Sequence, residues 1–282
     1  MERRNRQAVR FFELPVLPYV RAVRGINVTH NFHRHVHEGY CIGIITKGSR
    51  TINRGGVATI IPQKASFIIN PGEVHACKSC EGGHSYMILS IEAEYMQGVA
   101  SQISGRKQSA PHFRNTLIHD AELYSKIITF FSVFAEGNSD LEKDSSLLSL
   151  LSLIILRYSE APPKIGCRVL HDRTIQRVCD FISEHYASPL SLKQLSEEAS
   201  LSPFYFQRLF LERTGISPHD YLMQFRMKQA RQLLVKGCNI AHVALDTGFA
   251  DQSHLTRCFK QLTGITPGSY LTDVVSGSKS PG

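Results

Sequence analysis

The sequence lacks any apolar run long enough to cross a lipid bilayer. The longest run, residues 147–156, has about ten residues and includes two serines, whereas a membrane-spanning helix needs about twenty. The basic N-terminal stretch MERRNRQAVRFFELP is not followed by the apolar segment of a secretory signal. Seven scattered cysteines form no dense disulfide framework. These absences predict a soluble cytoplasmic protein without a membrane partner.

The composition is that of a globular protein large enough for two domains. The chain has 282 residues, of which 42% are hydrophobic and 20% charged. Its net charge of +8 is compatible with a polyanionic partner, but it divides into +5 up to residue 172 and +3 after it. Within residues 208–236, however, six basic residues accompany two acidic ones. Contacts to phosphates depend on such local patches more than on total charge.

A segment near the C-terminal end occurs twice. Residues 202–222 (SPFYFQRLFLERTGISPHDYL) match residues 251–271 (DQSHLTRCFKQLTGITPGSYL) 49 positions later. Two copies indicate a duplicated supersecondary unit, because a solenoid needs at least three. The identical pairs are Arg208 and Arg257, Phe210 and Phe259, Thr214 and Thr263, Gly215 and Gly264, Ile216 and Ile265, Pro218 and Pro267, Tyr221 and Tyr270, and Leu222 and Leu271.

Each copy predicts a helix, a tight turn and a second helix. Ser191, with Gln194 three residues later, has the pattern of a capping box, and Ser202 precedes Pro203 as a second cap. Asn239 and Asp251 are the corresponding caps in the second copy, where Gly248 ends the first helix. Helical spacing assigns the inner faces to Phe206, Leu209 and Phe210, and to Leu255, Cys258, Phe259 and Leu262. It assigns the outer faces to Phe204, Gln207, Arg208 and Leu211, and to Gln252, Ser253, Thr256, Arg257 and Lys260.

This layout is the helix-turn-helix plan for the major groove of DNA. A helix of about nineteen residues without a breaker, 218–236, is predicted between the two copies and would span roughly 28 Å. That length brings two recognition helices near the ~34 Å repeat of one groove face. A phosphate contact is expected from Arg231 on this helix. A plain helical bundle is the competing structural interpretation.

Residues 173–275 resemble the DNA-binding domain of the AraC/XylS family of bacterial transcription regulators. The resemblance rests on LSPFYFQRLFLERTGISPHDYL, FRMKQARQLL and IAHVALDTGFADQSHLTRCFKQLTGITPGSY. It implies double-stranded DNA as a partner, a homodimer, and RNA polymerase as a further candidate partner. The base-contacting residues that it implies are Phe204, Gln207, Arg208, Gln252, Ser253, Thr256 and Arg257.

The N-terminal part is rich in short β-runs. After an extended arm at 1–20, strands are predicted at 41–46, 49–53, 57–61, 66–70 and 86–91, with Gly-containing turns between them. Such spacing favours a small antiparallel barrel or jelly roll. His35-x-His37, followed by Pro71-Gly-Glu-Val-His75, resembles the two half-motifs of a cupin and the sensing domain of AraC-type regulators.

Alternate strand residues share a face, so His35 and His37 are expected opposite His75 and Cys77 in an effector pocket. No cofactor is expected. A metal at His35, His37 and His75 remains an alternative, although Cys41 and Ile42 stand where a cupin would carry its glutamate ligand. Cys80 and His84 could join His75 and Cys77 in a zinc or thiol-sensing cluster, a further alternative.

Residues 112–159 are predicted to form two helices separated by Gly137-Asn138, with Asp120 as a cap. The apolar stripe of the second helix is wider than one barrel face needs (Leu147, Leu150, Leu151, Ile154, Ile155 and Tyr158). Packing of the two helices on each other is expected to explain most of it, and a dimer interface to explain the surplus. Pro162-Pro163 lies in a predicted linker, 160–172, and residues 276–282 are a predicted tail.

The sequence therefore predicts a two-domain α+β protein. A cupin-like β-barrel (21–111) and a helical dimerisation segment (112–159) precede an all-α domain (173–275) with two helix-turn-helix units joined by a long helix. The predicted function is a transcription regulator that binds a promoter and responds to a small molecule, with no catalytic residue. The alternatives are a metal-dependent cupin enzyme with a helical appendage, or a regulator whose barrel only dimerises.

Overall fold

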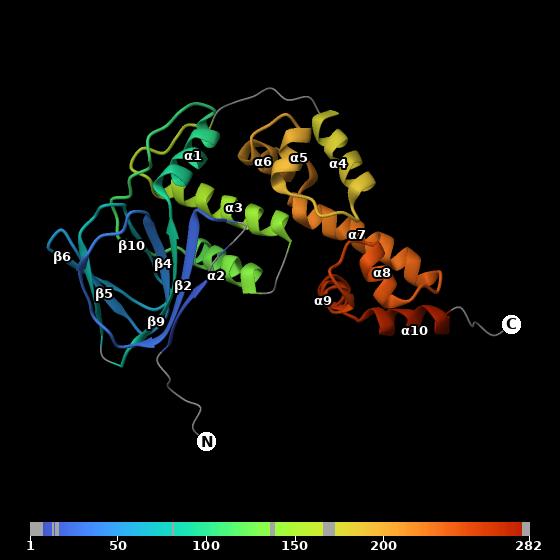
Figure 1. Ribbon diagram of the computed structural model, residues 1–282, viewed down its shortest axis with the longest axis horizontal. Helices are drawn as coiled ribbons and strands as arrows, with labels where there is room; N and C mark the ends of the chain where they lie inside the picture. The colour runs from blue at the N-terminus through green and yellow to red at the C-terminus, as the bar shows by residue number, and fades with distance from the viewer. Residues whose placement is uncertain are drawn as a thin grey trace, which may run out of the picture. The chain divides into compact units, whose positions relative to one another are not determined.

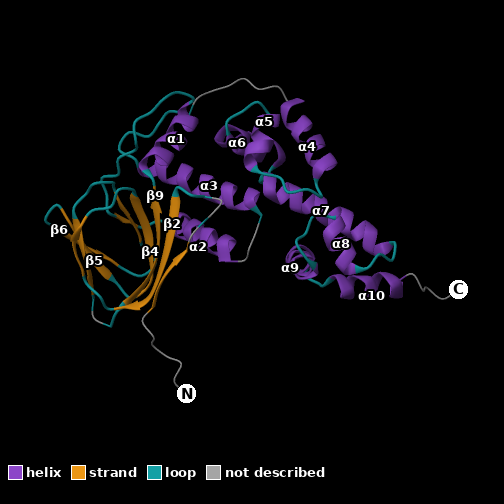
Figure 2. Ribbon diagram, in the orientation of Figure 1, coloured by secondary structure: helices purple, strands orange, loops and turns teal. Residues whose placement is uncertain are grey.

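The computed structural model describes residues 8–277 except 13, 15, 16, 81, 136–138 and 166–172. The chain divides into two compact units. One comprises residues 1–168 without 139–141, and the other comprises residues 169–282 with 139–141. All the described strands lie in the first unit, and the described part of 169–282 is helical (Figures 1 and 2). Each unit is described by itself.

The first unit contains two antiparallel sheets, as predicted for a jelly roll. One sheet has the order β1-β2-β9-β4-β7-β10 and the other the order β3-β8-β5-β6. Ile42 of β4, Phe67 of β7 and Leu89 of β9 are fully or almost fully buried. The bounds are β1 Ala8–Phe12, β2 Val20–Val28, β3 Phe32–His35, β4 Tyr40–Lys47, β5 Arg50–Arg54, β6 Val57–Ile61, β7 Ser66–Ile69, β8 His75–Ser79, β9 His84–Ile91 and β10 Leu117–Ile118.

The predicted N-terminal arm is in part a strand of the first sheet. β1 pairs with β2 from Ala8 opposite Ile26 to Phe12 opposite Ala22. The description of residues 8–12 as a separate arm was therefore wrong, because their backbone groups hydrogen-bond to β2. Residues 1–7 lie outside the described part of the chain.

Three helices accompany the sheets: α1 (Ala93–Ser104), α2 (Ala121–Ala135) and α3 (Asp140–Tyr158). α1 was not predicted, although Met96, Val99, Ala100 and Ile103 are buried at helical spacing. Asp120 caps α2 as predicted, since its carboxylate accepts hydrogen bonds from the backbone N–H groups of Glu122 and Leu123 at 2.7 and 3.2 Å. The predicted break at Gly137-Asn138 lies outside the described residues.

The apolar stripe of α3 is buried within the chain itself. Its five aliphatic members are 0% exposed, namely Leu147, Leu150, Leu151, Ile154 and Ile155. The expected surplus for a dimer interface is therefore not found in the aliphatic members of this stripe. A dimer stays a prediction without support from this helix.

The second unit consists of seven described helices, and both helix-turn-helix units are present as predicted. Their bounds are α4 Arg173–His185, α5 Leu192–Glu198, α6 Pro203–Thr214, α7 Pro218–Val235, α8 Ile240–Asp246, α9 Gln252–Thr263 and α10 Pro267–Gly277. α10 extends two residues into the predicted tail. Residues 278–282 and the linker residues 166–172 lie outside the described part.

The duplication extends to the turns that follow α6 and α9. Gly215 and Gly264 end the two helices in the left-handed region, with φ of 78° and 82°. The hydroxyl of Thr214 donates to the backbone oxygens of Phe210 and Ile216, and that of Thr263 donates to those of Phe259 and Ile265. The repeated Thr-Gly-Ile sequence therefore builds the same turn twice. Among the described residues, no helix is long and apolar enough to span a membrane.

Candidate DNA interface and ligand site

The start of each recognition helix is fixed by a local cap. Ser191 and Gln194 form the predicted capping box at α5, and the Ser202 hydroxyl accepts a hydrogen bond from the Tyr205 backbone N–H at 3.4 Å. At α9 the Asp251 carboxylate accepts from the His254 N–H at 2.7 Å. These bonds satisfy backbone donors that a helix leaves unpaired at its N-terminus.

Most of the residues predicted to contact bases lie on accessible helix faces. Arg208, Gln252, Ser253 and Arg257 are exposed, while Gln207 and Thr256 are half-buried. The Thr256 hydroxyl donates to the backbone oxygen of Gln252 at 2.8 Å. Because the hydroxyl of Thr256 is bound within the helix, its methyl group is the part that can contact a base.

Two assignments of helix faces were wrong. Phe204 was placed on the outer face of α6 but is 6% exposed. Helical side chains lean towards the N-terminus of their helix, so an aromatic ring in the first turn covers the preceding turn instead of projecting outwards. Leu262 was assigned to the inner face of α9 and is 47% exposed, because it lies in the last turn, beyond the core around Phe259.

The long helix α7 holds a buried arginine that sequence reasoning missed. Arg226 is 4% exposed, and its Nε and Nη2 donate to the backbone oxygens of Tyr186 and Ser188 at 2.7 and 2.9 Å. Burial lowers its pKa to about 10. A Cβ on Gly248 would lie 2.9 Å from the guanidinium carbon of Arg226. Arg226 therefore also packs against the turn of the second helix-turn-helix unit. Its position among buried Leu222, Met223, Met227 and Ala230 at helical spacing was the signal.

Arg231, predicted to contact phosphate, has a different position. Its guanidinium lies over the ring of Phe259 at 5.8 Å from the centroid, and its Nε is buried. Arg231 therefore packs α7 onto α9, and its phosphate contact stays a prediction.

Three of the four residues predicted for the effector pocket come together in the first unit. One ligand atom of each of His35, His37 and His75 lies within 4.8 Å of the others, and among the described residues they form the one group suited to a metal. The ring centroids of His35 and His75 are 4.3 Å apart, and those of His37 and His75 are 5.0 Å apart. The pairing of His35 with His75 across β3 and β8 produces this proximity.

Burial favours the neutral form of His37 and His75. Burial lowers the pKa of His37 to about 4, with further lowering by the nearby His75, His35 and Arg50. The pKa of His75 is also lowered by burial, although its bond to the Glu73 carbonyl opposes this. The Nδ1 atoms of His35 and His75 lie 2.6 and 3.0 Å from the backbone oxygens of His33 and Glu73.

Cys77 does not belong to this group. It is 3% exposed and packs in the hydrophobic core with Ile52 and Tyr86. The alternative cluster with Cys80 and His84 does not form either, because Cys80 lies against the Thr51 hydroxyl and His84 Nδ1 against that of Ser79.

Arg50 is a second buried cation that the sequence reasoning missed. It is 4% exposed and its guanidinium lies 5.0 Å from the Phe32 ring centroid and 5.2 Å from that of Tyr86. Its Nε has no hydrogen-bond partner, and no carboxylate of the described chain lies within ion-pair distance. Alternation with Ile52, a core residue of β5, indicated an inward side chain.

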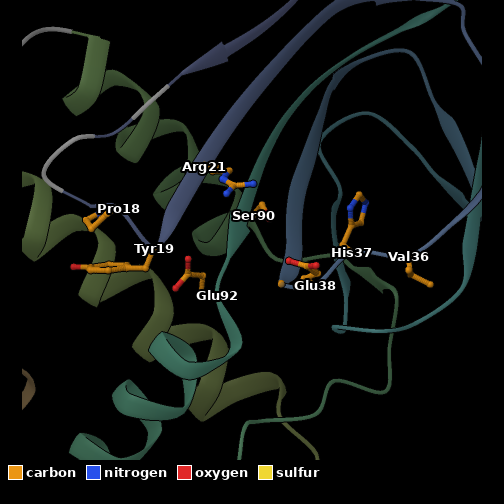
Figure 3. A pocket seen from close by; sticks show the side chains of 9 residues that line it. Pro18, Tyr19, Arg21, Val36, His37, Glu38, Ser90 and Glu92 are labelled. Atoms are coloured by element: carbon orange, nitrogen blue, oxygen red, sulfur yellow. The ribbon is translucent and has the colours of Figure 1, made fainter.

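A pocket of about 360 Å³ opens beside the histidines (Figure 3). His37 lines it, together with Arg21 and Ser90 from the neighbouring strands β2 and β9. Glu38 and Glu92 add two carboxylates, and the His37 ring points away from Glu38. The remaining lining residues are Pro18, Tyr19, Val36 and Gly39.

A jelly roll with a polar pocket and a helical unit with two exposed recognition helices define a class of protein, the ligand-responsive DNA-binding regulators. Family models agree with both parts. An AraC-like ligand binding domain matches residues 17–151, and a helix-turn-helix domain matches residues 195–273. The chain belongs to the AraC family of DNA-binding transcription regulators. Its relatives are regulators and not enzymes, which removes the hypothesis of a cupin enzyme.

Individual relatives cover most of the chain. It is 30% identical to the uncharacterised helix-turn-helix transcriptional regulator YbfI of Bacillus subtilis, over 84% of this chain and 86% of that one. It is 26% identical to the arabinose operon regulatory protein of Salmonella typhimurium, over 83% of each. A solved structure of the DNA-binding domain of AdpA with target DNA is 25% identical, with a TM-score of 0.37, over 38% of this chain and 98% of that one.

Proposed function

We propose that the protein binds a promoter by inserting α6 and α9 into successive segments of the major groove. The observation that carries this proposal is the pair of equivalent helices, each with an exposed arginine at the same position, Arg208 and Arg257. α7 between them has 18 residues and is therefore about 27 Å long. Successive major-groove segments on one face of DNA are ~34 Å apart. A spacer helix of this length can hold α6 and α9 at about that separation.

The exposed side chains suit particular base edges. Arg208 and Arg257 can each donate two hydrogen bonds to guanine O6 and N7, and Gln252 can pair with adenine. Ser253 can bond to either, and the methyl group of Thr256 suits that of thymine. Half-buried Gln207 has a smaller role, and buried Phe204 has none.

The first unit is the sensor in this proposal. A small molecule would enter the pocket of Figure 3 and contact His37, which lies close to His35 and His75. A ligand that favours one arrangement of the two units changes the population able to bind DNA. A homodimer, a cytoplasmic location and contact with RNA polymerase complete the proposal. A barrel that serves only for dimerisation is its rival, and a thermal shift with metabolites would distinguish the two.

Selection of binding sites from random duplexes tests the DNA part. Arg208→Ala and Arg257→Ala should each lose preference at one base-pair position, worth about 1–3 kcal/mol, and the two positions should differ. Lys47→Ala, which removes an exposed positive charge from β4, is the control that should keep both preferences. Unchanged preferences in both arginine variants would contradict the proposal.

A further inference from the structure

The arrangement of His35, His37 and His75 leaves imidazole nitrogens free to face one point. A backbone carbonyl can only accept hydrogen bonds, so the Nδ1 atoms of His35 and His75 must carry the protons in their bonds to His33 and Glu73. In a neutral ring with the proton on Nδ1, the Nε2 atom carries an available lone pair. This is the arrangement by which proteins fix the tautomer of a metal-binding histidine.

The backbone around the three rings is held in place by its own bonds. The Gly72 N–H donates to the His37 carbonyl at 2.9 Å, which joins the Pro-Gly turn to the loop between β3 and β4 that carries His37. The Glu73 carboxylate accepts from Arg54 at 2.9 Å and from the side chain of Asn70 at 3.0 Å. The turn that positions the carbonyl partner of His75 is therefore fixed from both sides.

The donor set selects one kind of ion. Three neutral imidazoles suit Zn²⁺, Ni²⁺, Cu²⁺ or Co²⁺, whereas Mg²⁺ and Ca²⁺ prefer oxygen. Glu73 is already bound to Arg54 and Asn70, and the position of a cupin glutamate is taken by buried Cys41 and Ile42. A tetrahedral ion with bonds of about 2.0–2.1 Å needs its nitrogens roughly 3.4 Å apart, which small rotations of the half-buried His35 and His37 rings achieve.

We propose that His35, His37 and His75 bind a divalent transition-metal ion of the zinc, nickel, copper or cobalt kind. His37 lines the pocket of Figure 3, so the ion has a route from solvent and an open coordination position on that side. The role of the ion as part of the signal rests on the proposed sensor function, but its binding does not.

Arg50 determines the charge of the ligand that is expected at the open coordination position of the metal. Its side chain is buried and has no carboxylate partner among the described residues. A second cation nearby is costly unless an anion neutralises it. The open position is therefore expected to take an anion such as a carboxylate.

Metal titration of the full-length, tag-free chain after chelator dialysis tests the site. The wild type should bind one Zn²⁺ per chain in competition with a chromogenic chelator, and Co²⁺ should give a visible spectrum that azide alters. His37→Ala should weaken Zn²⁺ binding more than about 100-fold, since it removes a direct ligand. Because His37 is half-buried, this variant is less at risk of misfolding than His75→Ala.

His33→Ala is the matched control, because its side chain is exposed and only its backbone oxygen contacts the site. It should bind Zn²⁺ like the wild type. Equal affinity in His37→Ala and the wild type, or no Zn²⁺ bound to the wild type, would overturn the metal site. An unaltered Co²⁺ spectrum with azide would overturn the open position. DNA binding measured on the same samples shows independently whether the regulator function stands.

Discussion

The two helix-turn-helix units share their turns and cores but differ on their outer faces. Arg208 and Arg257 are exposed at equivalent positions. One turn earlier, the first unit has buried Phe204 where the second has exposed Ser253; one turn later, it has exposed Leu211 where the second has Lys260. The first recognition helix thus uses part of its outer face for its own packing. The second leaves that face polar, and we expect it to provide more of the base and phosphate contacts.

The largest expected effect comes from Phe204. Phe204→Ala should destabilise the first helix-turn-helix unit by about 3–5 kcal/mol, because it removes a buried aromatic ring. Ser253→Ala at the equivalent exposed position should change stability by less than about 0.5 kcal/mol. Hydrogen exchange in the full chain measures both, at the α5 and α6 amides for Phe204→Ala and at the α8 and α9 amides for Ser253→Ala. A stable Phe204→Ala protein with altered base preference would restore Phe204 to the outer face.

Replacement of Arg226 should lower the stability of both helix-turn-helix units. Arg226→Met keeps an apolar stem but leaves the Tyr186 and Ser188 carbonyls unpaired, which should cost about 2–4 kcal/mol. Lys228→Met, at an exposed position of the same helix, is the control. Calorimetry of the full chain should show a lower transition only for the Arg226 variant. Equal transition temperatures would mean that Arg226 does not hold the two helix-turn-helix units together.

The smallest expected effect is on salt dependence. Lys260→Leu should weaken binding to all sequences alike and reduce the slope of log K against log[salt] by about 1, because one phosphate contact is lost. The reciprocal change, Leu211→Lys, should steepen the slope by a similar amount. Fluorescence anisotropy at several salt concentrations measures both. Equal slopes in the two variants and the wild type would show that neither position faces phosphate.

Local patterns predicted the elements that depend on local chemistry. Ser191, Ser202 and Asp251 cap helices as predicted, because the groups involved are a few residues apart in sequence. His35 and His75 were predicted because strand alternation and two half-motifs place them on facing strands, whereas His37 lies in the loop between β3 and β4.

The positions that were missed depend on contacts between distant segments. Helical spacing assigns Phe204 to a face but does not show that the preceding turn covers it. The partners of Arg226 lie 38 and 40 positions away, and β1 is a strand only because β2 lies beside it. α1 was missed because its N-cap, Glu92, makes no side-chain capping bond.

The central claim is that α6 and α9, joined by the rigid helix α7, contact one face of the same duplex about one helical turn apart. The most direct test inserts five base pairs between the two blocks of a selected binding site, which moves one block to the opposite face. We predict that affinity falls to that of non-specific DNA. Unchanged affinity for the lengthened site would contradict the claim.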